Sequence, residues 1–144
     1  MAQQNRNSHE WQVRPKEIKK WVGSTFDKET ILYAEDFGKY LVKERLTTSQ
    51  IRNIFGEVKR LQGTLQGKDS LDAKIKKDFL MLRPKLAYAA KRAGSRGIDA
   101  LKDVLDNAHK AVDLEGKHLK KQFENFVDFF EAILAYHKAA GGRD

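Results

Sequence analysis

Residues 119–138 read LKKQFENFVDFFEAILAYHK, and this stretch decides the fold class. Its apolar residues recur at intervals of three and four, the spacing that puts side chains on one face of an α-helix. That face comprises Leu119, Phe123, Phe126, Val127, Phe130, Ile133, Leu134 and His137. So broad an apolar face predicts a helix packed against other helices, and Gly141-Gly142 is expected to end it.

The same helical spacing recurs upstream, between short connections. It predicts helices over about 28–45, 48–62, 71–82, 84–94 and 98–112. Asp27 is expected to cap the first of these, and Thr47 with Gln50 resembles a capping box for the second. Pro84 predicts a kink or a fresh start, because proline lacks the N–H that the helix ladder needs. The sequence thus predicts an all-α fold, a compact bundle of five to six helices.

The bundle is predicted as a single domain over residues 28–144, preceded by a polar arm over residues 1–27. The arm begins MAQQNRNSHEW and is expected to be partly flexible. It carries two tryptophans, Trp11 and Trp21, whose role is left open. No apolar signal core appears in it, and no apolar run approaches the roughly 18 residues that cross a bilayer. We therefore expect a soluble, cytoplasmic protein.

The overall charge favours a polyanionic partner. The chain of 144 residues has a formal net charge of +8 and no cysteine, with a sequence pI near 9.6. A nucleic acid and an anionic membrane surface both fit this balance. The absence of cysteine excludes disulfides and thiolate chemistry.

One stretch concentrates the positive charge. Residues 82–97, LRPKLAYAAKRAGSRG, hold no acidic residue and five basic ones: Arg83, Lys85, Lys91, Arg92 and Arg96. On a helix, Lys85, Tyr88 and Arg92 share one face, and small residues fall on the other. A helix backed mostly by alanine lacks the apolar face that inserts into a membrane, so the stretch favours a nucleic-acid backbone. Tyr88 is expected to pack beside the phosphate-binding edge. Arg83 has a structural alternative, tying helix ends together around Pro84.

A second basic edge is predicted on the helix over 48–62. Arg52 and Lys59 project together there, with Gly56 and Gly63 beside them, where a backbone can approach closely. Arg60 points further round the helix. It is a candidate for RNA contact or, equally, an ion-pair partner of the neighbouring Glu57.

No catalytic or metal-binding constellation stands out. The histidines are His9, His109, His118 and His137, which are far apart and are interpreted as ordinary surface or interface residues. Asp99, Asp103 and Asp106 are interpreted as a solvated helix face. Glu124, Asp128 and Glu131 face either a basic neighbour or water. We expect no catalytic residues, no metal and no cofactor, and hence no enzyme.

Three segments carry a family resemblance: LTTSQIRNIFGEVKRLQ from Leu46, LMLRPKLAYAAKR from Leu80 and FENFVDFFEAILAYHK from Phe123. With the helices between them, they resemble the small subunit of type III-A CRISPR interference complexes, the Csm small subunit, over about residues 28–138. The resemblance implies an all-α subunit without catalytic activity, in an antiviral defence system. Such subunits stack as an inner filament beside the backbone subunits that hold the guide RNA.

The resemblance also implies a ligand and partners. The ligand is the target RNA as it pairs with the guide RNA, and the partners are the large subunit, the backbone subunits and further copies of the chain. Whether the isolated chain is a dimer is left open. The expected RNA contacts are Arg52, Lys59, Arg60, Arg83, Lys85, Lys91, Arg92 and Arg96. The alternative is a purely structural subunit that braces the complex with little direct RNA contact.

Overall fold

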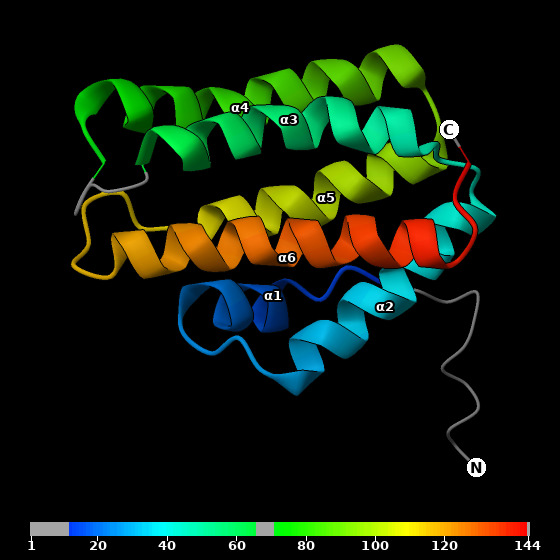
Figure 1. The fold of residues 1–144 in the computed structure, drawn as a ribbon, viewed down its shortest axis with the longest axis horizontal. Coiled ribbons are helices and arrows are strands. Elements are labelled where there is room, and N and C mark those ends of the chain that lie inside the picture. Colours follow the sequence, from blue (N-terminus) through cyan, green and yellow to red (C-terminus); the bar gives the residue numbers. More distant parts are fainter. Residues whose placement is uncertain (1–11, 66–70, 144) are drawn as a thin grey trace.

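Six helices follow one another in the described part of the chain, residues 12–65 and 71–143 of a computed structural model, and no strand lies among these residues. They are α1 (Pro15–Gly23), α2 (Lys28–Lys43), α3 (Thr48–Leu65), α4 (Ala73–Ala93), α5 (Arg96–Lys110) and α6 (Leu119–Ala139). The predicted all-α bundle is confirmed. Figure 1 shows α3 and α4 on one side, α5 and α6 in the middle, and α1 and α2 on the other side.

Helix α6 contacts more of the bundle than any other described helix. It packs most extensively against α2 and α3, and it also contacts α1 and α5. Its predicted apolar face is buried except for the half-buried Leu134, and Phe129, which lies outside that face, is fully buried as well. The Phe129 ring lies 6.3 Å from the ring of Tyr33 on α2. The buried surface is therefore wider than the periodicity predicted, because α6 is covered from both sides.

The local signals for two helix starts act as predicted. The Asp27 side chain accepts a hydrogen bond from the Glu29 N–H at 3.0 Å. At the start of α3, the Gln50 N–H donates to Thr47 Oγ1 at 3.1 Å. The Gln50 side chain in turn accepts from the Thr47 N–H at 2.9 Å. Both starts satisfy N–H groups that have no partner within their own helix.

Helix α1 lies in the segment that the sequence assigned to the polar arm, and there the boundary is corrected. Its Ile18, Trp21 and Val22 are buried in the common core, so the packed bundle includes residues well before Lys28. Tertiary hydrogen bonds hold the end of α1: Asn125 Nδ2 donates to the Val22 carbonyl at 3.1 Å. Three apolar residues in a polar stretch gave too weak a periodic signal. The other tryptophan, Trp11, lies outside the described residues.

Pro84 lies inside α4, and the helix continues across it. The prediction of a separate helix from Pro84 was therefore wrong. Proline removes one N–H, so the carbonyl four residues earlier, at Leu80, loses its helical partner. Both residues are exposed, so water can satisfy that carbonyl, and the flanking turns keep the helix together.

Replacing Pro84 by alanine is expected to stabilise the protein. The change restores the N–H to the ladder of α4 and relieves the contact of the ring with the preceding turn, an effect of about 1–3 kcal/mol. Urea denaturation of the Pro84→Ala variant checks this. If the variant has an unfolding free energy equal to or below that of the wild type, Pro84 does not strain the helix.

Candidate nucleic-acid interface

All eight predicted RNA-contact residues are exposed. Helix α3 carries Arg52, Lys59 and Arg60, helix α4 carries Arg83, Lys85, Lys91 and Arg92, and Arg96 begins α5. Their surroundings divide them into two groups. Some are paired with acidic side chains of this chain, and others have no ion pair within the described residues.

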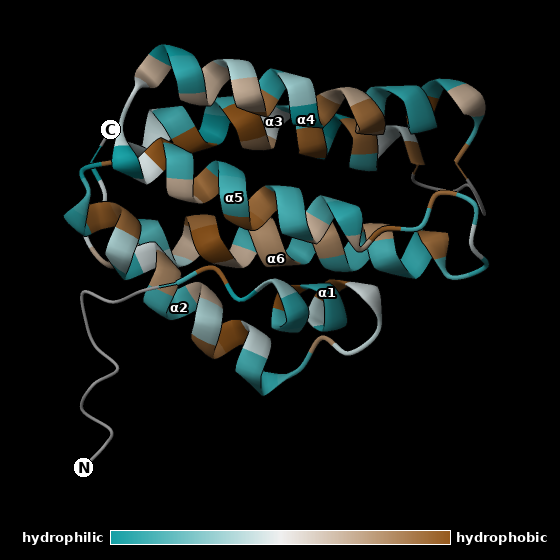
Figure 2. Ribbon diagram, turned by 180° about the vertical axis from the view of Figure 1, so that it is seen from behind, coloured by the Kyte–Doolittle hydropathy of each residue, from teal (hydrophilic) through white to brown (hydrophobic). Residues whose placement is uncertain are grey.

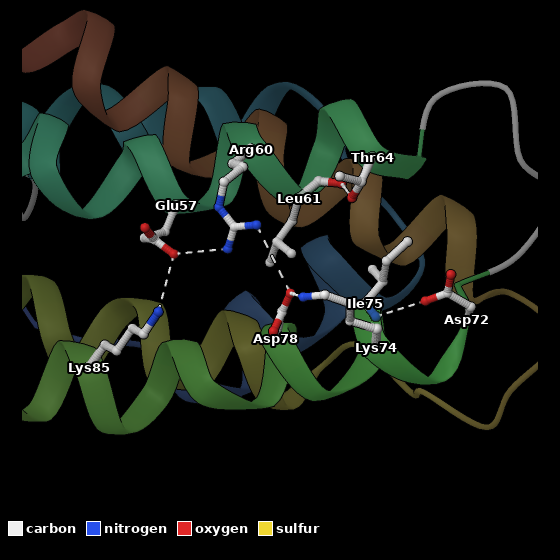
Figure 3. A network of polar contacts seen from close by, with 9 residues as sticks. All are labelled: Glu57, Arg60, Leu61, Thr64, Asp72, Lys74, Ile75, Asp78 and Lys85. Atoms are coloured by element: carbon white, nitrogen blue, oxygen red, sulfur yellow. Dashed lines mark hydrogen bonds and ion pairs between the residues drawn. The ribbon is translucent and has the colours of Figure 1, made fainter.

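An ion-pair network joins α3 to α4 (Figure 3). Glu57 Oε1 lies 3.1 Å from Arg60 Nη2 and 3.2 Å from Lys85 Nζ. Arg60 also reaches Asp78 at 4.0 Å, and Lys74 contacts the same Asp78 at 3.0 Å. Hydrogen bonds from Arg60 and Lys85 hold the pKa of Glu57 below its usual range, and the bond from Arg60 has the larger effect. The network reduces the positive potential that Arg60 and Lys85 offer to a phosphate.

Two further cations are engaged elsewhere. Arg83 Nε lies 3.4 Å from Asp106 Oδ1 on α5. This contact joins α4 to α5 and supports the structural role that was the alternative for Arg83. Lys59 Nζ donates to Gln62 Oε1 at 2.7 Å and lies 5.9 Å from the centre of the Phe55 ring. Exposed ion pairs and hydrogen bonds of this kind contribute little to stability. They nevertheless hold the two side chains close to their own surface.

Four candidates have no ion pair within residues 12–65 and 71–143: Arg52, Lys91, Arg92 and Arg96. They lie at one end of the molecule, which we call the basic end. The Glu57–Lys85 and Arg60–Asp78 contacts show that α3 and α4 run antiparallel. The start of α3 therefore lies beside the end of α4, where α5 also begins, at the right of Figure 1.

Arg45 extends the basic end, although no pattern in the sequence indicated it. It lies in the connection between α2 and α3 with φ of 64°, and it is exposed. A Cβ on Gly97 would lie 3.1 Å from Leu46 Cβ and 3.4 Å from Glu44 Cβ. This close approach places the start of α5, and with it Arg96, against the connection that carries Arg45. No spacing within one helix could show this, because it depends on the topology.

The expectations for Tyr88 and for the two glycines on α3, Gly56 and Gly63, have different outcomes. Tyr88 is 67% exposed, and its packing beside a phosphate-binding edge stays a prediction. Gly56 and Gly63 are exposed and open, with nothing within 4 Å of a Cβ built on either. A backbone can therefore approach this edge of α3, as predicted.

Helix α6 presents an acidic stripe, Glu124, Asp128 and Glu131, which forms no ion pair within the part of the chain that the structure describes. Partial burial raises the pKa of Asp128, and the repulsion from Glu131 and Glu124 raises it further. Lys121 and Lys59 act on it in the opposite direction but form no contact. The stripe is thus a second charged surface, opposite in sign to the basic end.

Two histidines lie in the interior, His109 and His137. The interpretation of His109 as a surface or interface residue was wrong, whereas His137 is buried with the apolar face of α6 on which the helical spacing placed it. Each donates from Nε2 to a main-chain carbonyl: His109 to Phe79 at 2.7 Å, and His137 to Leu46 at 2.6 Å.

The described residues contain no group of three or more side chains that could hold a metal ion. None of the helices in the described ranges is long and apolar enough to cross a membrane.

Stability is expected to fall in mild acid because of His109. Burial, and to a lesser degree Arg83, hold the pKa of His109 below its usual range, against the opposing effects of the Phe79 carbonyl and Asp106. The unfolded chain therefore takes up this proton first as the pH falls below about 6.5, which favours unfolding. Between about pH 7 and pH 5, the wild type is expected to lose more unfolding free energy than His109→Gln. Parallel curves for the two proteins in urea denaturation would contradict this.

A comparison with family models gives a match over most of the chain. The model described as Csm2 Type III-A matches residues 25–143. Searches of curated proteins and of solved structures gave no match.

Proposed function

The chain belongs to the Csm2 type III-A family and is a small subunit of the type III-A CRISPR complex, and from this premise we propose that its basic end holds target RNA. The binding is non-catalytic and takes place where the target pairs with the guide RNA. The other Csm subunits are its partners. We propose that the large and backbone subunits are among them, and that the complex works in the cytoplasm.

The grouping of unpaired cations carries this proposal. Arg52, Lys91, Arg92 and Arg96 come from three helices and meet at one end of the molecule. Exposed arginine and lysine without an acidic partner are the groups that neutralise phosphates and release counterions. Arg45 adds a fifth cation at the same end. The paired residues Arg60, Arg83 and Lys85 contribute less, because a phosphate has to displace a carboxylate from each of them.

The chemistry of these residues suits binding without sequence preference. Long flexible cations at an exposed end contact phosphates rather than base edges. Base pairing between guide and target then supplies the sequence selection, a division of labour found in other RNA-guided effectors.

Stacking of copies completes the proposal. One copy offers few phosphate contacts and binds weakly, whereas linked copies gain affinity by acting together. The acidic stripe of α6 provides a surface of opposite charge for the basic residues of a neighbouring copy. We propose that this pairing sets the register of an inner filament.

A second candidate function has support in the ion pairs. Three of the eight predicted RNA contacts, Arg60, Arg83 and Lys85, are engaged with acidic residues of the same chain. This favours, for these three residues of α3 and α4, a role in bracing the complex rather than in holding RNA.

Crosslinking of the isolated chain to two unrelated single-stranded RNAs, at low and at high salt, separates the two functions. RNA binding through phosphates is expected to give crosslinks to both sequences at low salt and to lose them at high salt. The crosslinked peptides are expected to come from the basic end. Absence of crosslinks at low salt, or a strong preference for one sequence, would favour the bracing function instead.

A further inference from the structure

The outer face of α4 carries an apolar stripe without a partner in this chain. Four large apolar side chains are exposed in the described residues, and three of them are on α4: Leu80 at 54%, Met81 at 43% and Tyr88 at 67%. Pro84 lies between them and is exposed as well. Met81, Pro84 and Tyr88 are spaced at i, i+3 and i+7, so they share one face of the helix. Scattered apolar residues are ordinary, but a continuous stripe indicates an interaction surface.

A groove of about 550 Å³ runs beside this stripe, between α4, α5 and the connection that follows α5. Leu80 and Pro84 line it, so the stripe and the groove are continuous. Phe79, Val112 and Leu114 contribute further apolar lining. Figure 2 shows α4 at the outer edge of the bundle, far from α1 and α2, with hydrophobic residues along it.

The charged residues around the groove favour an acidic partner. Arg83, Lys102 and Lys110 line it, together with a single carboxylate, Asp106. Asp106 already contacts Arg83 at 3.4 Å and Lys102 at 3.0 Å. The excess of positive charge is complementary to carboxylates that flank an apolar segment.

Two other occupants, RNA and a second copy of the chain, fit less well. RNA gains nothing from Leu80, Met81 or Pro84, whose side chains offer no donor to a phosphate. A second copy has no matching apolar surface, since the one exposed large apolar residue outside α4 in the described chain is Leu32. Symmetric pairing of two α4 helices would bring their lysines and arginines together, which is unfavourable.

We propose that the stripe and groove dock a short amphipathic segment of a different protein, with two or three apolar side chains flanked by carboxylates. From Leu80 to Tyr88 the stripe is roughly 12 Å long at the rise of an α-helix, enough for two turns of such a segment. Because the chain belongs to the Csm2 family, the other Csm subunits are its partners. We expect the docked segment to belong to one of these subunits. This inference concerns α4 and α5 and does not depend on RNA binding at the basic end.

Photocrosslinking in the complex assembled with the other subunits of its own type III-A system tests the proposal. The photoreactive residue p-benzoylphenylalanine replaces Leu80 in one sample and Leu32, the matched exposed leucine on α2, in another. The expected result is a crosslink from position 80, and none from position 32, to a different protein subunit at an acidic segment. A crosslink to a second copy, a crosslink to RNA, or no crosslink from position 80 would each overturn the proposal.

A double substitution gives an independent measure. Leu80→Asp with Met81→Asp is expected to lower incorporation into the complex at least about tenfold, because it puts carboxylates against an acidic partner. Both residues are exposed, so the melting temperature of the isolated chain and its RNA crosslinking should stay unchanged. Leu32→Asp is the control and should assemble normally. Normal incorporation of the double variant would overturn the proposal even if the RNA-binding function holds.

Discussion

Gly38→Ala is expected to destabilise the protein by at least about 3 kcal/mol, at the upper end of what overpacking costs. Gly38 is buried on α2, where α2 makes the most extensive helix contact of the described fold, with α6. A Cβ at this position would lie 2.8 Å from the His137 nitrogen and 2.9 Å from the Tyr136 carbonyl carbon. Both are backbone atoms, so no change of rotamer relieves the clash and the two helices must separate.

Gly56→Ala is the matched control for this substitution. Gly56 is also inside a helix, but nothing lies within 4 Å of a Cβ built there. Removing a helical glycine without a clash is expected to stabilise the protein by about 0.5–1 kcal/mol. Urea denaturation of both variants measures the difference. If Gly38→Ala unfolds with the free energy of the wild type, the close approach of α2 and α6 is not as described.

Reversing the charge of Lys91 and Arg92 together is expected to weaken RNA binding by the isolated chain at least about a hundredfold at low salt. Each reversal removes a cation from a phosphate and adds a repulsion, and a change of 1.4 kcal/mol per residue already corresponds to a factor of ten. The two side chains form no ion pair within the described chain. Lys91→Glu with Arg92→Glu should therefore leave folding intact. Fluorescence anisotropy with a labelled single-stranded RNA measures the affinity.

The control for this double reversal is Lys19→Glu with Lys20→Glu. These two lysines are exposed on α1, on the side of the bundle away from α3 and α4 (Figure 1). The control changes the net charge of the protein by the same amount. If both double variants lose the same affinity, overall charge rather than the basic end governs the binding.

The features predictable from sequence were the local ones. The face of α6 and the Thr47–Gln50 capping box depend on residues only a few positions apart, so the spacing of side chains was sufficient. The exposure of Lys91 and Arg92 followed in the same way from the helical projection.

Features that depend on contacts between distant segments were not predictable. Lys85 meets Glu57 across 28 positions, and Arg83 meets Asp106 across 23. These contacts divide the predicted basic surface into paired and unpaired cations. Helix α1 needs the Asn125 side chain, 103 positions away, to complete its end. A single sequence contains no signal for such pairs until the order and direction of the helices are known.

The salt dependence of target-RNA affinity in the assembled complex tests the central claim most directly. For the wild type, the logarithm of the affinity is expected to fall steeply and linearly with the logarithm of salt concentration, with the same slope for unrelated guide–target pairs. With Lys91→Glu and Arg92→Glu in the small subunit, the slope should become shallower by about 0.7 to 1 for each phosphate that the variant no longer neutralises. Equal slopes for the wild-type and variant complexes would contradict the assignment of the basic end as the RNA-binding surface.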